Sequence, residues 1–157
     1  MTKKEVKIFL DSNVKISGLF SDKGAPRIIL DLLCLDLPVL AGMTGQYNII
    51  ETERNIKKKM PEVLSLYNDY LPKLNLEIIP LPPLKMIRDL SGHISNKDAP
   101  VIASAIIGKV DFLVTGDKKD FVRPSKNGKY PFKIVTPSEF LEKILPVILK
   151  NLPSSPE

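Results

Sequence analysis

Prolines divide this sequence into short segments, and that division limits the folds it can adopt. Fourteen of the 157 residues are proline. Each proline lacks a backbone N–H donor, and its ring clashes inside a helix. Between the prolines, short apolar runs alternate with stretches of helical periodicity. Because strands that alternate with helices form a parallel sheet covered on both faces, we expect an α/β fold.

The apolar runs and periodic stretches give the expected elements. We expect strands over residues 6–10, 38–41, 76–79, 112–115 and 133–135. Helices are expected over residues 27–35, 44–60, 62–71, 84–90, 98–109 and 137–149. In the first of these helices Ile28, Leu32 and Leu35 form one apolar face, and Thr44 is expected to cap the second.

Length and composition fit one folded domain. A chain of 157 residues and 17.5 kDa suits a single core, so we expect one domain over residues 1–150 and a flexible tail over 151–157. No apolar run is long enough for a membrane span, and residues 6–10 are too short for a signal peptide, so a cytoplasmic protein is expected. The net charge of +5 fits a nucleic-acid partner.

The chain has one cysteine, Cys34, in the apolar run ILDLLCLDL. A single cysteine excludes a disulfide within the chain. Free cysteine behaves as a small hydrophobic residue, so we expect the Cys34 thiol to be buried in the core.

Acidic residues follow two of the expected strands. Asp11 comes directly after residues 6–10, and Asp117 follows residues 112–115 in the sequence Thr115-Gly116-Asp117. Ligand sites of parallel α/β sheets lie beyond the carboxyl ends of the strands. If the two strands are neighbours, the two carboxylates share one site, and a divalent cation would relieve their repulsion.

Three further acids are candidates for the same site. Asp98 begins an expected helix and lies on its apolar stripe with Ile102 and Ala105. Glu51 lies beside the apolar stripe of the helix over residues 44–60, where the nearby Glu53 competes for the role, and Asp120 follows Asp117 by three residues. Oxygen ligands without a His or Cys cluster favour Mg²⁺ or Mn²⁺ over zinc.

Each acid also has an ordinary interpretation when it is taken alone. Asp11 and Asp98 are typical helix caps, Asp117 is a typical turn residue, and Glu51 is a typical surface acid. Their joint placement at strand ends and on inward faces is what favours a shared metal site.

Four segments together resemble the motifs of PIN domains. They are FLDSNV near the start, the ETERNI helix, NKDAPVIASAI and LVTGDKKDF. In that family an Asp ends the first strand, a Glu lies on an early helix, and an Asp opens a later helix. A final Asp lies in a T-G-D turn. The matching residues here are Asp11, Glu51, Asp98 and Asp117.

The resemblance implies a three-layer α/β/α sandwich with a parallel sheet of about five strands. It also implies an Mg²⁺- or Mn²⁺-dependent ribonuclease that cuts single-stranded RNA and leaves a 3′-hydroxyl and a 5′-phosphate. Many bacterial and archaeal members, the VapC-like group, are toxins paired with a small antitoxin, and homodimers are common in the family.

Residues beside the acids receive supporting roles in this hypothesis. The hydroxyls of Ser12 and Thr115 and the amide of Asn13 are expected to orient the carboxylates. Lys118, Lys119 and Arg123 follow the last acidic motif and are expected to contact RNA phosphates, although a solvated basic loop is an equal alternative. His93 is expected to be a polar loop residue without a catalytic role.

Two other classes of protein are the alternatives. A non-catalytic RNA-binding PIN-like module would bind metal weakly or not at all. A phosphatase of the haloacid dehalogenase type would need a second acid at position 13, where this sequence has Asn13.

Overall fold

A computed structural model describes residues 5–92, 94–122 and 130–152 of the chain. Within them, five strands form one sheet in the order β3-β2-β1-β4-β5, and every pair is parallel. The strands are β1 (Val6–Leu10), β2 (Leu40–Gly45), β3 (Glu77–Ile79), β4 (Phe112–Val114) and β5 (Lys133–Val135).

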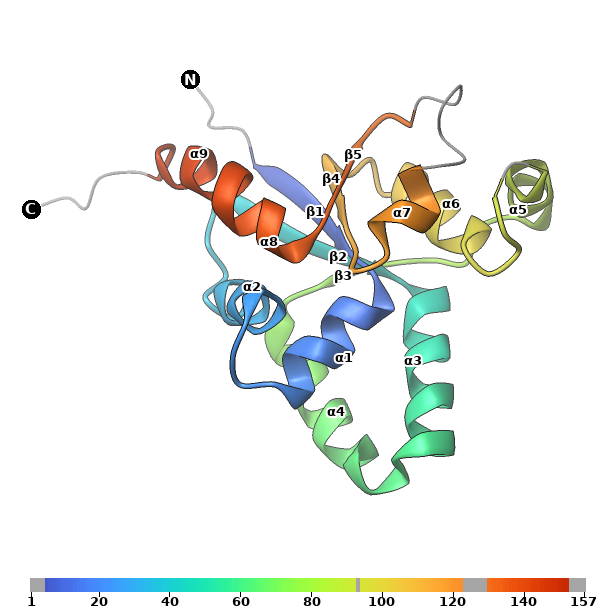
Figure 1. Ribbon diagram of the computed structural model, residues 1–157, viewed down its shortest axis with the longest axis horizontal. Helices are drawn as coiled ribbons and strands as arrows, with labels where there is room; N and C mark the ends of the chain where they lie inside the picture. Colours follow the sequence, from blue (N-terminus) through green and yellow to red (C-terminus); the bar gives the residue numbers. More distant parts are fainter. Residues whose placement is uncertain (1–4, 93, 123–129, 153–157) are drawn as a thin grey trace, which may run out of the picture.

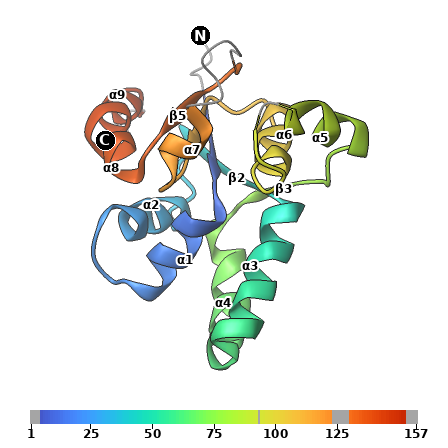
Figure 2. The same ribbon diagram turned by 45° about the vertical axis from the view of Figure 1, so that its right-hand side comes forward.

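Helical segments connect and cover the strands (Figures 1 and 2). The α-helices are α1 (Ser12–Phe20), α2 (Ala25–Cys34), α3 (Gln46–Lys59), α4 (Leu64–Tyr70), α5 (Leu84–Ser91), α6 (Ala99–Ile107), α7 (Lys118–Val122), α8 (Pro137–Glu139) and α9 (Leu145–Leu149). Two 3₁₀ turns, Pro61–Val63 and Leu71–Leu74, flank α4, and a π-helical turn, Phe140–Ile144, joins α8 to α9.

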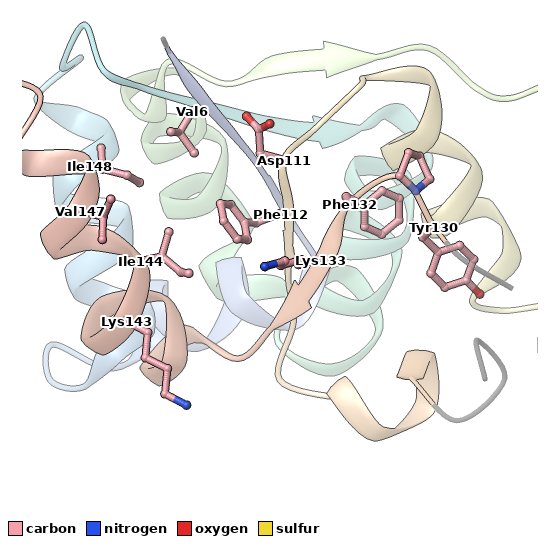
Figure 3. A pocket seen from close by; sticks show the side chains of 11 residues that line it. Val6, Asp111, Phe112, Tyr130, Phe132, Lys133, Lys143, Ile144, Val147 and Ile148 are labelled. Atoms are coloured by element: carbon pink, nitrogen blue, oxygen red, sulfur yellow. The ribbon is translucent and has the colours of Figure 1, made fainter. Parts of the chain in front are cut away.

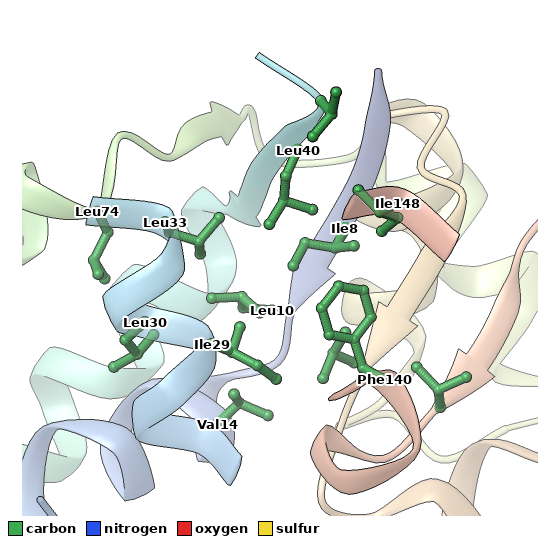
Figure 4. Close-up of a cluster of buried hydrophobic side chains, with 13 residues drawn as sticks. Ile8, Leu10, Val14, Ile29, Leu30, Leu33, Leu40, Leu74, Phe140 and Ile148 are labelled. Atoms are coloured by element: carbon green, nitrogen blue, oxygen red, sulfur yellow. The ribbon is translucent and has the colours of Figure 1, made fainter. Parts of the chain in front are cut away.

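The sheet is buried on both faces, as the alternation of strands and helices predicted. Ile8 and Leu10 of β1 pack in one cluster with α1, α2, the π turn and α9 (Figure 4). Phe9 between them packs in a second cluster with α6 and α7 on the opposite face. Successive side chains of a strand point to opposite faces, so the apolar run over residues 8–10 of β1 places one core on each side of the sheet. The predicted three-layer α/β/α sandwich is confirmed.

Several predicted elements differ from the structure in detail. The stretch that follows Asp11 forms α1, and Asp11 caps this helix, as its ordinary interpretation allowed. Residues 118–122 form α7, which was not among the expected helices. In α2 the buried residues are Ile29, Leu30 and Leu33, whereas Ile28 and Leu35 are exposed, so the predicted apolar face of this helix is wrong.

Thr44 does not cap a helix. It is the fifth residue of β2, which runs to Gly45, and α3 begins only at Gln46 without a side-chain cap. The Thr44 hydroxyl instead donates to the carbonyl of Leu10 on the neighbouring strand, 3.2 Å away. A hydroxyl at a strand end can bond across the sheet, and that tertiary contact cannot be recognised from local sequence.

Cys34 is exposed, which contradicts the expectation of a buried thiol. It is the last residue of α2, and the face that this helix buries carries Ile29, Leu30 and Leu33. The apolar run around Cys34 therefore continues past the helix end onto the surface.

Pro146 lies one residue inside α9, directly after the π-helical turn. Proline has no N–H to donate to the carbonyl four residues earlier, and its ring crowds that carbonyl. A π turn widens the helix at this point, so the predicted helix over residues 137–149 is formed by two α-helical segments with a π-helical turn between them. Within the described residues no helix is long and apolar enough to span a membrane.

A glycine allows α1 to approach α2 closely. A Cβ atom added at Gly18 would lie 2.5 Å from Cδ1 of Leu30 and 3.0 Å from the carbonyl oxygen of Pro26. We expect Gly18→Ala to lower the free energy of unfolding by about 1–3 kcal/mol, because overpacking exceeds the greater helix propensity of alanine. Urea denaturation measures the change. Gly92→Ala is the control, because its nearest neighbour would be 3.8 Å away; equal stability of both variants would contradict the prediction.

Candidate metal site at the carboxyl edge of the sheet

Asp11 and Asp117 meet because β1 pairs with β4. Leu10 is in register with Val114, and the backbone N–H of Asp11 donates to the carbonyl of Val114 at 3.0 Å. The Thr115 hydroxyl donates to Oδ2 of Asp11 at 2.8 Å and accepts from the backbone N–H of Asp117 at 3.1 Å. A single buried threonine therefore joins the two acids.

The Asp11 carboxylate is buried, with only 7% of the residue exposed. Burial raises the pKa of Asp11, and the negative charges of Glu51 and Asp117 raise it further. The hydrogen bonds from Thr115 and from the backbone of Ser12 act in the opposite direction but do not cancel the rise in pKa. Burial and the neighbouring acids together therefore disfavour the charged form of Asp11.

Ser12 links Asp11 to Glu51 of α3. Its backbone N–H donates to Oδ1 of Asp11 at 2.8 Å, and its hydroxyl donates to Oε1 of Glu51 at 3.0 Å. The side-chain amide of Asn48 donates to the Ser12 hydroxyl at 3.0 Å and to Oδ1 of Asp11 at 3.4 Å. Among the described contacts, the buried Oδ1 of Asn48 has no hydrogen-bond partner.

Asn13 orients Asp117 in a similar way. Its Nδ2 donates to Oδ2 of Asp117 at 2.8 Å, and its Oδ1 accepts from the backbone N–H of Gly116 at 3.1 Å. Asn13 belongs to α1 and Asp117 follows β4, so the amide fixes the turn after β4 against the first helix.

Asp98 lies at the start of α6, a helix that contacts α3 and β2. It occupies the N-cap position without a side-chain cap bond, and Oδ2 accepts from the Ser95 hydroxyl at 2.8 Å. Burial raises the pKa of the Tyr47 phenol, and the charges of Glu51, Asp98 and Asp11 raise it further, against a lowering by Arg54. One phenol on α3 is thus close to three of the acids.

The structure separates Glu51 from its competitor Glu53. Glu51 is bonded to Ser12, the residue next to Asp11. The charge of Glu53 instead contributes to the raised pKa of Tyr67 on α4, after burial as the main cause. Glu51 is therefore the glutamate that belongs to the acidic edge, the name used below for Asp11, Glu51, Asp98 and Asp117.

Ser12 and Thr115 link Asp11 to Glu51 and to Asp117, whereas the carboxylate of Asp98 is bonded to Ser95. Among the described residues, no three His, Cys, Asp or Glu side chains form a group that could hold a metal ion. The donors of the acidic edge are all oxygen atoms, which suits Mg²⁺ or Mn²⁺. A divalent ion would also offset the repulsion between Asp11 and the neighbouring charges of Glu51 and Asp117.

The residues that were predicted to contact RNA phosphates lie in different environments. Nζ of Lys118 lies 2.9 Å from both carboxylate oxygens of Glu139, so this lysine joins α7 to α8. Lys119 is exposed. Arg123, His93 and the side chain of Asp120 lie outside the described part of the structure.

Three residues at the edge were missed in the sequence. Asn48 and Tyr47 precede Glu51 by three and four residues, and Lys15 follows Asp11 by four. Residues at these spacings share a helix face, which was the available signal. Lys15 was also hidden by its charge, because lysine is almost never fully buried unless it is paired.

A hollow of about 590 Å³ lies at the other edge of the sheet (Figure 3). Its walls include Val6, Phe112 and Lys133, which begin β1, β4 and β5, and Ile144 and Val147 of the C-terminal helical segment. The hollow therefore lies at the amino ends of these strands. The acidic edge lies at their carboxyl ends, so the two sites are separate.

Comparison with known proteins supports the fold through structure and not through sequence. No protein-family model and no curated protein matches the sequence. The structure of VapBC2 from Rickettsia felis, bound to a DNA fragment from its promoter, is similar at a TM-score of 0.62 and 18% identity, over 83% of this chain and 98% of that chain.

Two further crystal structures are similar. PAE2754 from Pyrobaculum aerophilum has a TM-score of 0.62 and 15% identity, over 90% of this chain and 96% of that chain. FitAcB from Neisseria gonorrhoeae has a TM-score of 0.59 and 16% identity, over 83% of this chain and 98% of that chain. At these identities the likeness establishes a shared fold. The chain is thus an α/β protein of PIN-like fold with an acidic edge at the carboxyl ends of its central strands.

The buried Lys15 gives a stability prediction with a defined pH window. Burial lowers the pKa of Lys15 from 10.5 to about 8, against opposing contributions from Asp11 and Glu51. The unfolded chain binds this proton more tightly than the folded chain, so the ammonium destabilises the fold at neutral pH. Lys15→Met should therefore raise the free energy of unfolding by roughly 2 kcal/mol at pH 7.

The gain should be complete below pH 8 and should disappear as the pH approaches 10.5. Urea denaturation of the wild type and Lys15→Met across this range tests the prediction. Lys57→Met, at an exposed lysine of α3, is the matched control. A loss of stability in Lys15→Met at pH 7 would refute the prediction.

Proposed function

We propose that this protein is a divalent-metal-dependent endoribonuclease that hydrolyses phosphodiester bonds of single-stranded RNA. One observation carries the proposal: a buried carboxylate, Asp11, is tied through Thr115 to Asp117 and through Ser12 to Glu51. Burying a carboxylate among other acids is costly unless a cation compensates the charge. The free-energy cost of burying the Asp11 carboxylate is explained if the arrangement serves to bind metal.

Asp11, Glu51, Asp98 and Asp117 would hold Mg²⁺ or Mn²⁺, with Asp120 as a further candidate. Such an ion, when bound, lowers the pKa of its water ligand and polarises the scissile phosphate. Ser12, Thr115 and Asn13 keep the carboxylates oriented through the hydrogen bonds described above. The reaction requires no nucleophilic side chain, and its expected products carry a 3′-hydroxyl and a 5′-phosphate.

The RNA backbone would lie along the basic side of the same edge. Lys119 is exposed next to Asp117 and can approach a phosphate, and Arg123 is a further candidate. Lys118 would have to leave Glu139 to do the same, so Lys119 is the stronger candidate of the two lysines.

We also propose a cytoplasmic toxin of a toxin–antitoxin pair as the biological setting. The support is the resemblance of the four acidic motifs to the VapC-like group, together with the shared fold of a structure that bears the VapBC name. A small antitoxin would then be the protein partner, and a homodimer is the expected assembly.

RNA cleavage is the direct test of the proposed function. The wild type should cut a labelled single-stranded RNA panel with Mn²⁺ or Mg²⁺ and should not cut it with EDTA. Asp11→Asn and Asp98→Asn should reduce the rate by roughly a hundredfold or more, as the loss of one electrostatic group in an active site does. Asp69→Asn, at an exposed acid of α4, is the control and should cut at the wild-type rate.

Equal cutting by all the variants would indicate a contaminant or a different site. Absence of cutting together with normal Mn²⁺ binding would favour the non-catalytic RNA-binding module. Absence of both would refute the proposed function.

Thr115→Val tests the link between the two acids at the strand ends. Valine keeps the shape of the buried side chain but removes the hydroxyl that bonds Asp11 and Asp117. We expect the affinity for Mn²⁺ to fall roughly 10- to 100-fold, as for other groups that orient metal ligands. Calorimetric titration with Mn²⁺ measures it. Thr52→Val, which loses a hydroxyl bonded to the carbonyl of Asn48, controls for the loss of a buried hydrogen bond.

A further inference from the structure

A buried lysine lies behind the acidic edge. Lys15 of α1 is 2% exposed, and its Nζ donates to the Thr44 hydroxyl at 3.1 Å. Thr44 in turn donates to the carbonyl of Leu10, the residue before Asp11. The ammonium is therefore held between the carboxyl ends of β1 and β2.

The carboxylates that act on this ammonium are Asp11 and Glu51. Their charges oppose the effect of burial on the Lys15 pKa, so the lysine and the two acids share one electrostatic environment. In the described contacts, however, the carboxylate oxygens accept from Ser12, Asn48 and Thr115, and Lys15 bonds to Thr44. Lys15 thus acts on the acids through its charge while their oxygens accept hydrogen bonds from other groups.

Two other roles fit the geometry poorly. A side chain that is 2% exposed cannot reach an RNA phosphate. A purely stabilising role conflicts with the burial of the ammonium, because burial disfavours its charged form. Lysine is almost never fully buried unless it is paired, so the burial of Lys15 at the ends of β1 and β2 points to function.

We propose that the Lys15 ammonium is a resident counter-ion of Asp11 and Glu51 that competes electrostatically with the divalent ion and sets a moderate metal affinity. This inference rests on the proposed function, because it assumes that these acids bind metal. Lys15 is a positioning residue in this scheme: it touches neither the RNA nor the metal, and it limits the negative charge that attracts cations.

The test is a calorimetric titration of the full chain with Mn²⁺ alone, without RNA, at pH 7 and moderate salt. Lys15→Met should bind Mn²⁺ roughly tenfold more tightly than the wild type, because a nearby like charge has been removed. Lys15→Gln, which is neutral and polar, should show the same gain and serves as the second variant if methionine impairs folding. Lys15→Arg keeps the charge and should restore wild-type affinity.

Lys57→Met removes an equal charge from an exposed position on α3 and should leave the affinity unchanged. Damage to the structure alone would weaken binding, so tighter binding identifies the electrostatic role. If the neutral variants bind Mn²⁺ with unchanged or lower affinity while Asp11→Asn abolishes binding, the proposed role of Lys15 is refuted. The proposed metal site is then still supported. If the wild type itself does not bind Mn²⁺, both the proposed metal site and the proposed role of Lys15 are refuted.

Discussion

The pairing of β1 with both β2 and β4 is the constraint on which the rest of the structure depends. Because all three strands are parallel, their carboxyl ends lie at one edge, where α1 and α3 begin and the turn to α7 follows β4 (Figure 1). Asp11, Thr115 and Thr44 come to this edge from three different strand ends. A shift in register would separate the hydroxyl of Thr115 from the carboxylate that it holds.

Burial gives this edge its electrostatic character. Asp11 and Lys15 are of opposite charge and lie one helical turn apart, and burial disfavours the charged form of both. The surrounding hydroxyls and amides satisfy the oxygens of the acids but carry no net charge to balance them. Acidic groups held in this way are suited to a divalent ion, and the proposed influence of Lys15 on that ion depends on the same low exposure.

The fold was predictable because its signals are repeated along the whole chain. Apolar runs marked the strands, prolines marked the boundaries, and strict alternation of the two element types left a parallel sheet as the main solution. The ends of the strands and helices, and the faces that the helices bury, were less predictable. The apolar residues of α2 can form more than one stripe, and Thr44 suits a helix cap until the neighbouring strand offers it the carbonyl of Leu10.

The sequence by itself determined the class of fold and singled out four candidate acids: Asp11 and Asp117 after strands, Asp98 at a helix start and Glu51 within an early helix. It determined them because hydrophobic periodicity and strand-end position are local properties of the chain. Only the tertiary structure decided which residues support those acids. It brought Asn48 to Ser12, distinguished Glu51 from Glu53, paired Lys118 with Glu139 and buried Lys15 beneath Asp11. These outcomes depend on contacts between residues far apart in the chain, and such contacts are fixed only when the strands pair and the helices pack.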